Sequence, residues 1–376
     1  MKKLFYAGVV LLVIFEAANV YFIMPLPGSQ RMQSIDLAYF LFSWRWAFRA
    51  LVGAMIVAGT PAALGVRPWR KPIAAGTVVL AGLVVYALDF RMSADHMFLE
   101  AASVRMQPAD RNAVEPARLV VGIDIDGDAR AYPLQFIGYH HQVRDTAGGR
   151  AVMVSYCTVC RTGRVWSPIV DGKVETFRLV GMDHFNAMFE DRTTRSWWRQ
   201  ATGQAITGPR KGKQLAEIPS VQVTLAQWLV LHPQSLIMQP DSTMLSRYPT
   251  NYAYESGSSR STLTGTDTAS WHDKSWVVGV TLNGESKAYD WNRLRKERAV
   301  NDIVGGTPVV VAVSADGASY FAFQRPDTAT RFVARGDSLV VQGRAWALGR
   351  SPLPAVPASQ EFWHSWRTFH PATGKY

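Results

Sequence analysis

One segment of the sequence occurs twice, and this duplication restricts the folds open to most of the chain. The run Val120–Tyr132 returns as Val277–Tyr289, and the same register continues without a gap from Asp145–Gly149 to Asp302–Gly306. A Trp-x-x-x-His-Pro motif then closes each copy, at Trp228–Pro233 and at Trp366–Pro371, although the spacers differ in sequence. Segments repeated in this way fold as copies of one supersecondary unit. We therefore expect one topology to occur twice, over about 118–238 and from about 275 to the end.

Turn signals and alternating apolar residues predict that each copy is rich in β-strands. Alternation surrounds Asp126-Gly127 in the first copy and Asn283-Gly284 in the second, and such pairs favour a tight hairpin. A second hairpin is predicted from Val165–Val170 and Val174–Val180, and a short capped helix over Leu225–Leu231. The predicted fold class is α+β, a strand-rich duplicated extracytoplasmic domain.

Domain boundaries follow from the duplication and from local composition. The segment 241–274 is rich in Ser, Thr, Gly and Tyr and poor in aliphatic residues, which predicts a linker or a long surface loop. The expected organisation is a membrane anchor over 1–91 and a first copy with the cysteines over 92–240. The linker over 241–274 and a second, degenerate copy over 275–376 complete the chain.

Three apolar stretches near the N-terminus predict a small all-α transmembrane module. They cover residues 4–24, 50–64 and 73–90, each long enough with its flanks to span or nearly span a bilayer. A cleavable signal peptide is the alternative for the first stretch, but a chain with later spans has no need to lose it. Basic residues at Lys2, Lys3 and in Arg67–Lys71 should stay in the cytoplasm. The large C-terminal part then lies outside.

The charge balance is basic, with 40 Lys and Arg against 29 Asp and Glu. The basic residues are scattered and no nucleic-acid motif accompanies them, so we expect no nucleic-acid partner. Attraction to anionic lipid headgroups explains the excess in a chain embedded in a bilayer. Glu16, inside the first apolar stretch, is costly in lipid, and we expect it to contact a polar group on a neighbouring helix.

The chain has two cysteines, Cys157 and Cys160, and the duplication helps to interpret them. In the gapless register four polar residues of the first copy have unrelated counterparts in the second. The pairs are His140 and Glu297, His141 and Arg298, Cys157 and Ser314, and Cys160 and Gly317. By contrast, the histidines of the closing motifs occur in both copies, which predicts a structural role for them. The residues found in one copy only are the candidates for chemistry.

A Cys-x-x-Cys pair on a turn between strands can direct two thiolates at one metal ion. We predict a site of His140, His141, Cys157 and Cys160 that holds a transition metal, with zinc, copper or iron as candidates. His184 is a further possible ligand. The spacing is not that of a structural zinc finger, because no second paired-ligand cluster accompanies it.

Two alternatives remain open for the cysteine pair. The first is thiol–disulfide exchange, although the Gly- and Pro-containing run after Cys160 does not predict the helix that follows the pair in thioredoxin-like proteins. Arg161 and Arg164 could still favour a thiolate electrostatically. The second alternative is an inert structural disulfide, which an oxidising compartment favours.

A second polar cluster covers Asp183–Gln200 and contains His184 and Asp191. If it folds against the cysteine turn, we expect His184, Asp191 and Arg161 to serve as catalytic groups. The alternative is that Trp197 and Trp198 anchor a core and the charges form a solvated face. No phosphate loop, dinucleotide fingerprint or Gly-x-Ser-x-Gly elbow is present.

Several motifs occur in an order that resembles the bacterial domain of unknown function family 3179. They are Gly122–Tyr132, His140–Asp145, Gly148-Gly149, Tyr156–Cys160 and Phe189–Trp197, followed by Gly203 and Gly208. The resemblance covers most of 118–238 and returns in weaker form from about 275. It implies an exported or membrane-anchored bacterial protein with a site shared by His140, Cys157, Cys160 and the block Asp191–Trp197. The second copy departs from the pattern, because it lacks the cysteines.

The predicted protein lies in the bacterial inner membrane, with its C-terminal domain periplasmic or extracellular. We expect it to bind a transition metal as a metalloenzyme or a metal carrier. A thiol–disulfide redox module, or a structural or interaction domain with an inert disulfide, are the alternatives. The expected partners are the lipid bilayer and an unknown small molecule or periplasmic protein.

Overall fold

The computed structural model describes residues 1–376, and the chain divides into two compact units, which we call the helical unit and the duplicated unit. The helical unit consists of Met1–Leu99, Phe177–Arg199 and Gln204–Lys213. The duplicated unit consists of Glu100–Thr176, Gln200–Gly203 and Gln214–Tyr376. A helical region with three apolar helices is thus followed by a strand-rich α+β domain of several sheets, as the sequence predicts.

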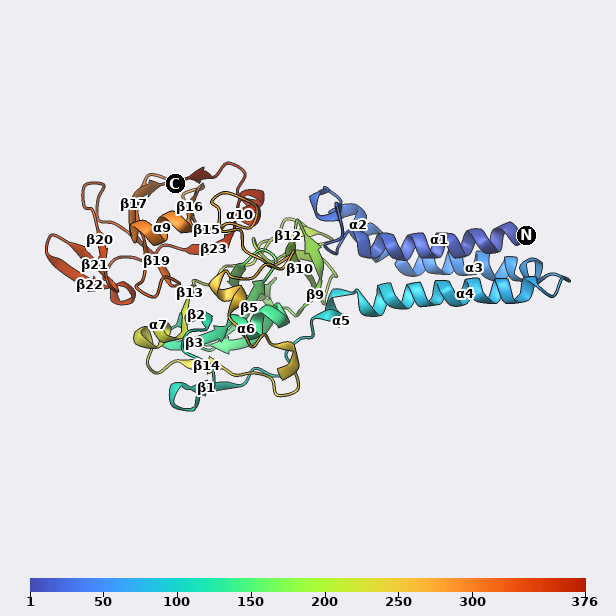
Figure 1. The fold of residues 1–376 in the computed structure, drawn as a ribbon, viewed down its shortest axis with the longest axis horizontal. Helices are drawn as coiled ribbons and strands as arrows, with labels where there is room; N and C mark the ends of the chain where they lie inside the picture. Colours follow the sequence, from blue (N-terminus) through green and yellow to red (C-terminus); the bar gives the residue numbers. More distant parts are fainter. The chain divides into compact units, whose positions relative to one another are not determined.

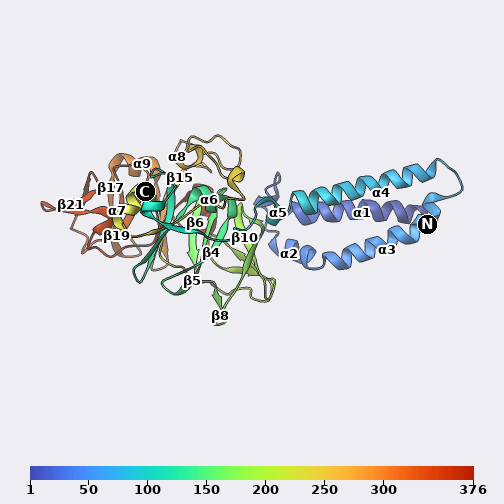
Figure 2. The same cartoon turned by 90° about the horizontal axis from the view of Figure 1, so that it is seen from below.

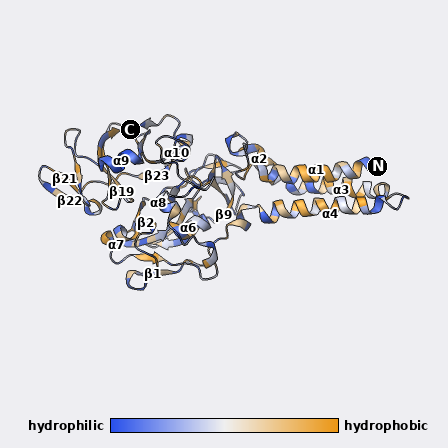
Figure 3. Ribbon diagram, viewed as in Figure 1, coloured by the Kyte–Doolittle hydropathy of each residue, from blue (hydrophilic) through white to orange (hydrophobic).

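Three helices of the helical unit are long and apolar enough to cross a membrane. They are α1 (Lys2–Tyr21), α3 (Arg45–Leu64) and α4 (Arg70–Tyr86), the last extended by a π-helical turn to Arg91. They lie side by side in both views, and their surfaces are mainly apolar (Figures 1, 2 and 3). A Cβ atom on Gly59 of α3 would lie 2.4 Å from the backbone nitrogen of Phe5 in α1. The close packing of α1 on α3 therefore requires glycine there.

Glu16 is paired with a charged side chain of a neighbouring helix. Arg49 of α3 donates to both of its carboxylate oxygens at 2.7 and 2.8 Å, and to Asp89 at 2.7 Å. Glu16 is fully buried. The predicted contact with a polar group of another helix is confirmed, and it is an ion pair.

A four-stranded sheet in the order β12-β11-β10-β9 also belongs to the helical unit. Its strands are β9 (Phe177–Asp183), β10 (Asn186–Asp191), β11 (Trp197–Arg199) and β12 (Ala205–Thr207). The short helix α2 (Ile35–Ser43) packs aromatic rings on it, because Tyr39 and Phe42 lie 5.1 and 5.4 Å from the ring of Trp197. Short helix α5 (Ala94–Met97) follows the third long helix.

In the duplicated unit, the same sheet occurs twice, as the sequence repeat predicts. The first copy pairs its strands in the order β13-β2-β3-β14, with β1 added at the edge, and the second in the order β23-β15-β16-β24. The first set is β1 (Met106–Pro108), β2 (Leu119–Ile125), β3 (Asp128–Pro133), β13 (Val221–Thr224) and β14 (Leu236–Met238). The second set is β15 (Trp276–Leu282), β16 (Glu285–Asp290), β23 (Ala358–Phe362) and β24 (Gly374–Lys375). Both predicted hairpin turns form, with positive φ at Asp126 and Asn283.

Each copy also has a three-stranded sheet and two short helices (Figure 1). The sheet strands are β4 (Gln142–Ala147), β5 (Arg150–Cys157) and β6 (Thr162–Trp166), and in the second copy β17 (Ala299–Val304), β18 (Thr307–Val313) and β19 (Tyr320–Gln324). The helices are α6 (Leu134–His140) and α7 (Leu225–Leu231), and in the second copy α9 (Trp291–Glu297) and α10 (Trp363–Phe369). Helix α7 has the predicted bounds, and the Thr224 side chain accepts from the Gln227 backbone N–H as its cap.

In each copy the tryptophan of the closing motif packs on a glycine of the strand that begins the repeat, which is β2 in the first copy and β15 in the second. A Cβ atom on Gly122 would lie 2.4 Å from the indole of Trp228, and one on Gly279 would lie 2.1 Å from the indole of Trp366. Each indole also stacks on the histidine that ends its helix, at ring-centre distances of 4.1 and 3.9 Å. These histidines are His232 and His370. Both histidines thus have the structural place that the duplication predicts.

One local prediction needs correction, and one small sheet was not predicted. A hairpin was predicted from Val165–Val170 and Val174–Val180. Only the two-residue strands β7 (Ile169–Val170) and β8 (Lys173–Val174) form it. Pro168 cannot donate to a ladder, and its carbonyl instead accepts from the Glu175 N–H at 2.8 Å. After β19, the second copy has an unpredicted three-stranded sheet. Its strands are β20 (Val333–Arg335), β21 (Ser338–Val341) and β22 (Arg344–Ala347).

The segment 241–274 is mostly irregular, with the one-turn helix α8 (Ala253–Ser256). It is more than a linker, because it fixes buried groups of the first copy. Glu255 accepts from Arg118 at 2.7 Å and from the Leu119 N–H at 2.6 Å, and both charged side chains are buried.

Candidate functional site

The two cysteines lie on the turn that joins β5 to β6. Cys157 ends β5 and pairs with Thr162 at the start of β6, and Arg161 between them has a φ of +58°. A strand, not a helix, follows the pair, as predicted. Both thiol side chains are 0% exposed, and no disulfide joins them.

The thiols contact each other and a hydroxyl group of the second copy. The Cys160 thiol is hydrogen-bonded to Cys157 and to Ser365 of α10. Burial raises the pKa of the Cys160 thiol well above its usual range, and the nearby thiol of Cys157 and carboxylate of Glu361 act in the same direction. Cys160 is therefore a protonated thiol at neutral pH in this arrangement.

Residues of the second copy, together with Lys274 at the end of the segment 241–274, cover the cysteine turn. The Cys160 carbonyl accepts from the Phe362 N–H at 2.9 Å. The Val159 carbonyl accepts from Lys274 Nζ at 2.7 Å and lies 3.1 Å from His364 Nε2. Burial lowers the pKa of Lys274, and burial together with the neighbouring Lys274 lowers the pKa of His364 to about 4, so the imidazole is uncharged at neutral pH. The turn is thus held by the second copy through its backbone carbonyls.

A buried carboxylate lies next to this cover. Glu361, on β23, is 1% exposed and accepts from Arg164 Nη2 at 2.6 Å. It also accepts from Ser365 Oγ at 2.7 Å and from Ser359 Oγ at 3.1 Å. The carboxylate therefore joins the hydroxyl beside Cys160 to a second hydroxyl on the far side.

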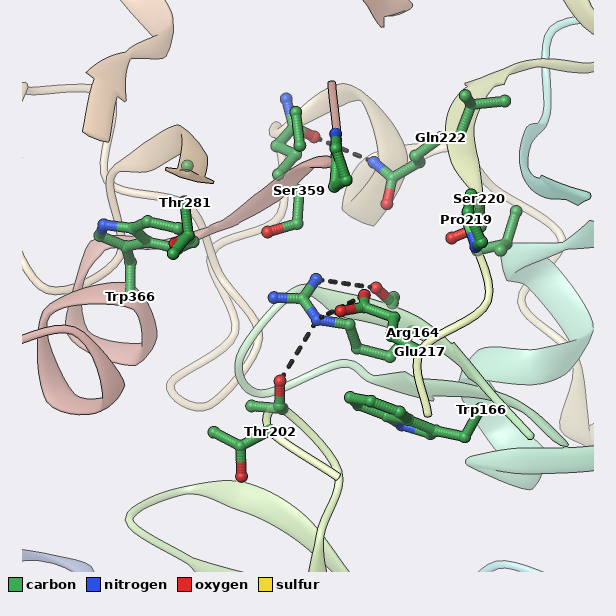
Figure 4. A pocket seen from close by; sticks show the side chains of 18 of the residues that line it. Arg164, Trp166, Thr202, Glu217, Pro219, Ser220, Gln222, Thr281, Ser359 and Trp366 are labelled. Atoms are coloured by element: carbon green, nitrogen blue, oxygen red, sulfur yellow. Dashed lines mark hydrogen bonds and ion pairs between the residues drawn. The ribbon is translucent and has the colours of Figure 1, made fainter. Parts of the chain in front are cut away.

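Ser359 and Arg164 face a cavity of about 550 Å³ between the two copies (Figure 4). Arg164 lies beside Glu217 in this cavity, with 3.4 Å between Nε and the carboxylate. Gln222 of β13 donates to Gln360 of β23 at 3.1 Å across it. The cavity walls are mixed, with tryptophan rings as well as these polar groups.

Each copy docks one turn on a helix of the other copy. The polar set around the cysteines occurs at only one of these two contacts. The turn that corresponds to the cysteine turn, at Asp316-Gly317, accepts a hydrogen bond from Thr224 at the start of α7 at 3.0 Å. Equivalent backbone bonds, Leu225 N–H to Arg118 and Trp363 N–H to Ser275, fix the correspondence of the surrounding residues. The polar groups that face the cysteines have unrelated counterparts at the other contact: Ala117 for Lys274, Val223 for Glu361, Ala226 for His364 and Gln227 for Ser365. The fold therefore does not require the polar set that faces the cysteines.

The predicted metal ligands do not form a ligand group. His140 lies 2.7 Å from the Tyr248 hydroxyl, and His141 Nδ1 lies 3.1 Å from the Tyr139 carbonyl oxygen. No group of three His, Cys, Asp or Glu side chains in the chain is arranged to hold a metal ion. His141 follows α6 with a φ of +60°, and burial lowers its pKa to about 4. The Cys157, Cys160 and histidine set predicted from spacing is thus not assembled.

Two of the three predicted catalytic residues, His184 and Asp191, belong to the helical unit, whereas the cysteines belong to the duplicated unit. His184 Nδ1 lies 2.7 Å from Asp183. Asp191 is fully buried and accepts from the Thr194 N–H at 2.6 Å and from the Trp198 indole at 2.9 Å. The tryptophans are core anchors, as the alternative interpretation held, but the neighbouring acids are buried too and form no solvated face.

Arg161, the third predicted catalytic residue, is fully buried and serves the contact between the copies. Its Nε donates to Gln360 at 3.0 Å, and Nη1 donates to the Tyr254 carbonyl at 3.1 Å. Its guanidinium lies 3.5 Å from the ring centre of Trp276. It follows Cys160 directly in sequence, but its bonds tie the segment 241–274 to the second copy.

The residues that face the cysteines from 274 onward were not predicted, because the second copy lacks cysteines. A usable signal existed. The comparison of copies that singled out Cys157 and Cys160 also singles out Lys274, Glu361 and Ser365, whose counterparts are unrelated.

Comparison with known proteins gives one match. The family described as protein of unknown function, DUF3179, matches residues 101–373. The chain belongs to this family. The DUF3179 match runs through both copies and the segment between them, so the residues that cover the cysteines lie within the family domain. No curated protein and no solved structure matches the chain.

Proposed function

We propose that this DUF3179 protein is a membrane-anchored thiol–disulfide redox protein, whose Cys157 and Cys160 alternate between dithiol and disulfide. The observation that carries the proposal is the hydrogen bond between the two thiols on a strand–turn–strand element. Two thiols in contact can close an intramolecular disulfide with little movement of the chain. A metal site would need further ligands, and no group of three metal-ligating side chains is available.

The chemistry is an exchange with a disulfide of a partner protein. The thiolate of one cysteine attacks a sulfur of the partner's disulfide, whose S–S bond breaks as a mixed disulfide forms. The second cysteine then attacks the mixed disulfide, which closes the Cys157–Cys160 bond and releases the partner. Two electrons pass to the partner, which leaves as a dithiol. Because both thiols are buried, the cover formed by Lys274 and His364 has to move before a partner can enter.

Membrane topology supports the same proposal. Three apolar helices suggest an anchor in the lipid bilayer, and the positive-inside bias of Lys2, Lys3 and Arg67–Lys71 favours a cytoplasmic location for these basic residues. The α+β domain would then lie in the periplasm or outside the cell, where disulfides form and persist. The expected partner is a periplasmic protein with an exchangeable disulfide.

The decisive experiment counts thiols in the full-length protein, purified in detergent without chelators. After equilibration with mixtures of reduced and oxidised glutathione, we expect two thiols to be lost and regained reversibly. The variant Cys160→Ser, which lacks the thiol that resolves the mixed disulfide on Cys157, should accumulate mixed disulfides, and the double serine variant is the control for labelling elsewhere. Thiols that never oxidise, or a disulfide that resists reduction in the folded protein, would refute the proposal. About one bound metal per chain, lost in the double variant, would instead support the predicted metal site.

A further inference from the structure

A continuous chain of hydrogen bonds runs from the buried thiols to the cavity between the copies. Cys160 is bonded to Ser365, and Ser365 Oγ donates to Glu361 at 2.7 Å. On the other side, Ser359 Oγ donates to the same carboxylate at 3.1 Å, and Ser359 lines the cavity (Figure 4). Hydroxyl groups can both accept and donate a proton, so every link can pass one on.

We propose that Glu361 is the proton acceptor and donor for the Cys160 thiol, and that the cavity connects this carboxylate to water. The inference rests on the proposed redox function and names the residue that makes it work in a buried site. A thiol has to lose its proton before its sulfur attacks a disulfide. Both thiols are fully buried, so bulk water does not reach them directly.

The charged groups around Glu361 are compatible with this role. Arg164 of β6 donates to the carboxylate and does not titrate. Tyr320 of β19 also lies nearby, and burial keeps its phenol protonated. His370, after α10, and Cys160 are the remaining titratable groups that interact with Glu361, and burial lowers the pKa of His370. Glu361 is thus the one carboxylate in contact with both hydroxyls.

The cavity has the properties that exchange with water requires. It is large enough for several water molecules, and Arg164, Glu217 and Gln222 offer hydrogen-bonding groups in it. The Nε2 atom of Gln360, at its wall, has no hydrogen-bond partner in the protein. Water can satisfy such a group at low cost.

Comparison of the copies shows that folding does not require the chain of bonds. The position of Glu361 is Val223 in the other copy, that of Ser365 is Gln227, and that of Cys160 is Gly317. Carboxylate, hydroxyl and thiol therefore occur together in one docking contact and are all replaced in the other.

The Cys160 proton passes through Ser365, which gives its own proton to Glu361 as it takes that of the thiol. The thiolate of Cys160 then attacks Sγ of Cys157 in the mixed disulfide, which forms the Cys157–Cys160 bond and releases the partner's thiolate. Glu361 returns its proton through Ser359 to water in the cavity, and the released thiolate takes one from the solvent.

The test measures the rate at which iodoacetamide alkylates Cys160 in the reduced full-length protein, as a function of pH. We expect Glu361→Gln, and independently Ser365→Ala, to slow alkylation near pH 7 by about 100-fold, the size usual for loss of a positioned acid–base group. A purely electrostatic role predicts the opposite for Glu361→Gln, because removal of a negative charge favours the thiolate. Alkylation at or above the wild-type rate in either variant would overturn the proposal.

Two controls keep the result interpretable. Ser365→Ala leaves the ion pair of Glu361 with Arg164 intact, so it separates proton transfer from folding. Gln227→Ala changes the corresponding position of α7, which faces the turn without cysteines, and should leave the rate unchanged. Reversible oxidation by glutathione tests the redox function separately. Loss of that reversibility refutes the proposed function, whereas unchanged alkylation refutes only the role of Glu361.

Discussion

The variant Gly279→Ala tests whether the position of α10 keeps the thiols buried. A Cβ atom on Gly279 would lie 2.1, 2.2 and 2.3 Å from three atoms of the Trp366 indole. Unstrained carbon contacts lie at about 3.5–4.0 Å, so the ring has to withdraw by more than about 1 Å. Trp366 belongs to α10, which also carries His364 and Ser365. A shift of the indole therefore disturbs the cover of the cysteine turn.

The expected cost follows from the contacts that are strained or lost. Overpacking of a buried site costs about 1–3 kcal/mol. The indole N–H of Trp366 also donates to Thr373 at 2.8 Å, and such a bond contributes about 0.5–1.5 kcal/mol. Alanine in a strand recovers roughly 0.5–1 kcal/mol relative to glycine. We expect a net loss of about 2–3 kcal/mol in the free energy of unfolding.

The assay combines urea unfolding with the rate of thiol labelling, and Gly122→Ala serves as the matched variant. Its Cβ atom would lie 2.4 Å from Trp228, so a similar loss of stability is expected there. Trp228 belongs to α7, which docks on the turn without cysteines. Labelling should therefore rise at least tenfold in Gly279→Ala and clearly less in Gly122→Ala. Equal labelling in the two variants, or wild-type stability in both, would show that the indoles yield without uncovering the thiols.

Three further predictions concern buried charge. Arg49→Leu leaves the carboxylate of Glu16 without its cation and should destabilise the helical unit by about 3–5 kcal/mol, measured as loss of helical circular dichroism on titration with SDS. Glu255→Gln should cost a similar amount in urea unfolding, because Arg118 stays buried. The pKa of His141 is about 4 in the folded protein and about 6.5 in the unfolded chain, so its stabilising contribution is complete above pH 6.5. It is lost as the pH falls towards 4, by up to about 3 kcal/mol, and His141→Asn should remove that part of the pH dependence.

Turn pairs, a helix cap and apolar stretches predicted the elements whose formation depends on residues close together in the sequence. The turn pairs at Asp126-Gly127 and Asn283-Gly284 need positive φ, and both hairpins form where the pairs occur. Helix α7 begins and ends at the residues that its cap and its terminal His-Pro predict. The three apolar stretches form three long helices, and Glu16 accepts a hydrogen bond from Arg49.

Contacts between distant segments explain what the sequence did not reveal. The strands from Phe177 to Thr207 cluster with the helical unit, although they interrupt the first copy in sequence. A similar reason applies to the cysteine turn, where no group of three metal-ligating side chains is present. His140 lies near Tyr248 from a segment with no strand pattern, and no periodicity indicates that pairing. The spacing of the two cysteines predicted only that they share a turn. The groups that cover them come from the second copy and from the end of the segment 241–274.

Duplication explains why one site can be assembled from two unequal halves. Each copy presses one turn against the first turn of the other copy's helix, so a substitution in the turn of one copy changes a contact with the other. The cysteines of the first turn and a carboxylate and hydroxyl of the second copy thus meet at one contact, whereas the other contact has the hydrogen bond from Thr224 to Asp316 and no thiol. It follows that neither copy alone contains the whole site. A chain that ends before the second copy would keep both cysteines and Lys274 but lose Glu361, His364 and Ser365, and its thiols should label as rapidly as those of an unfolded peptide.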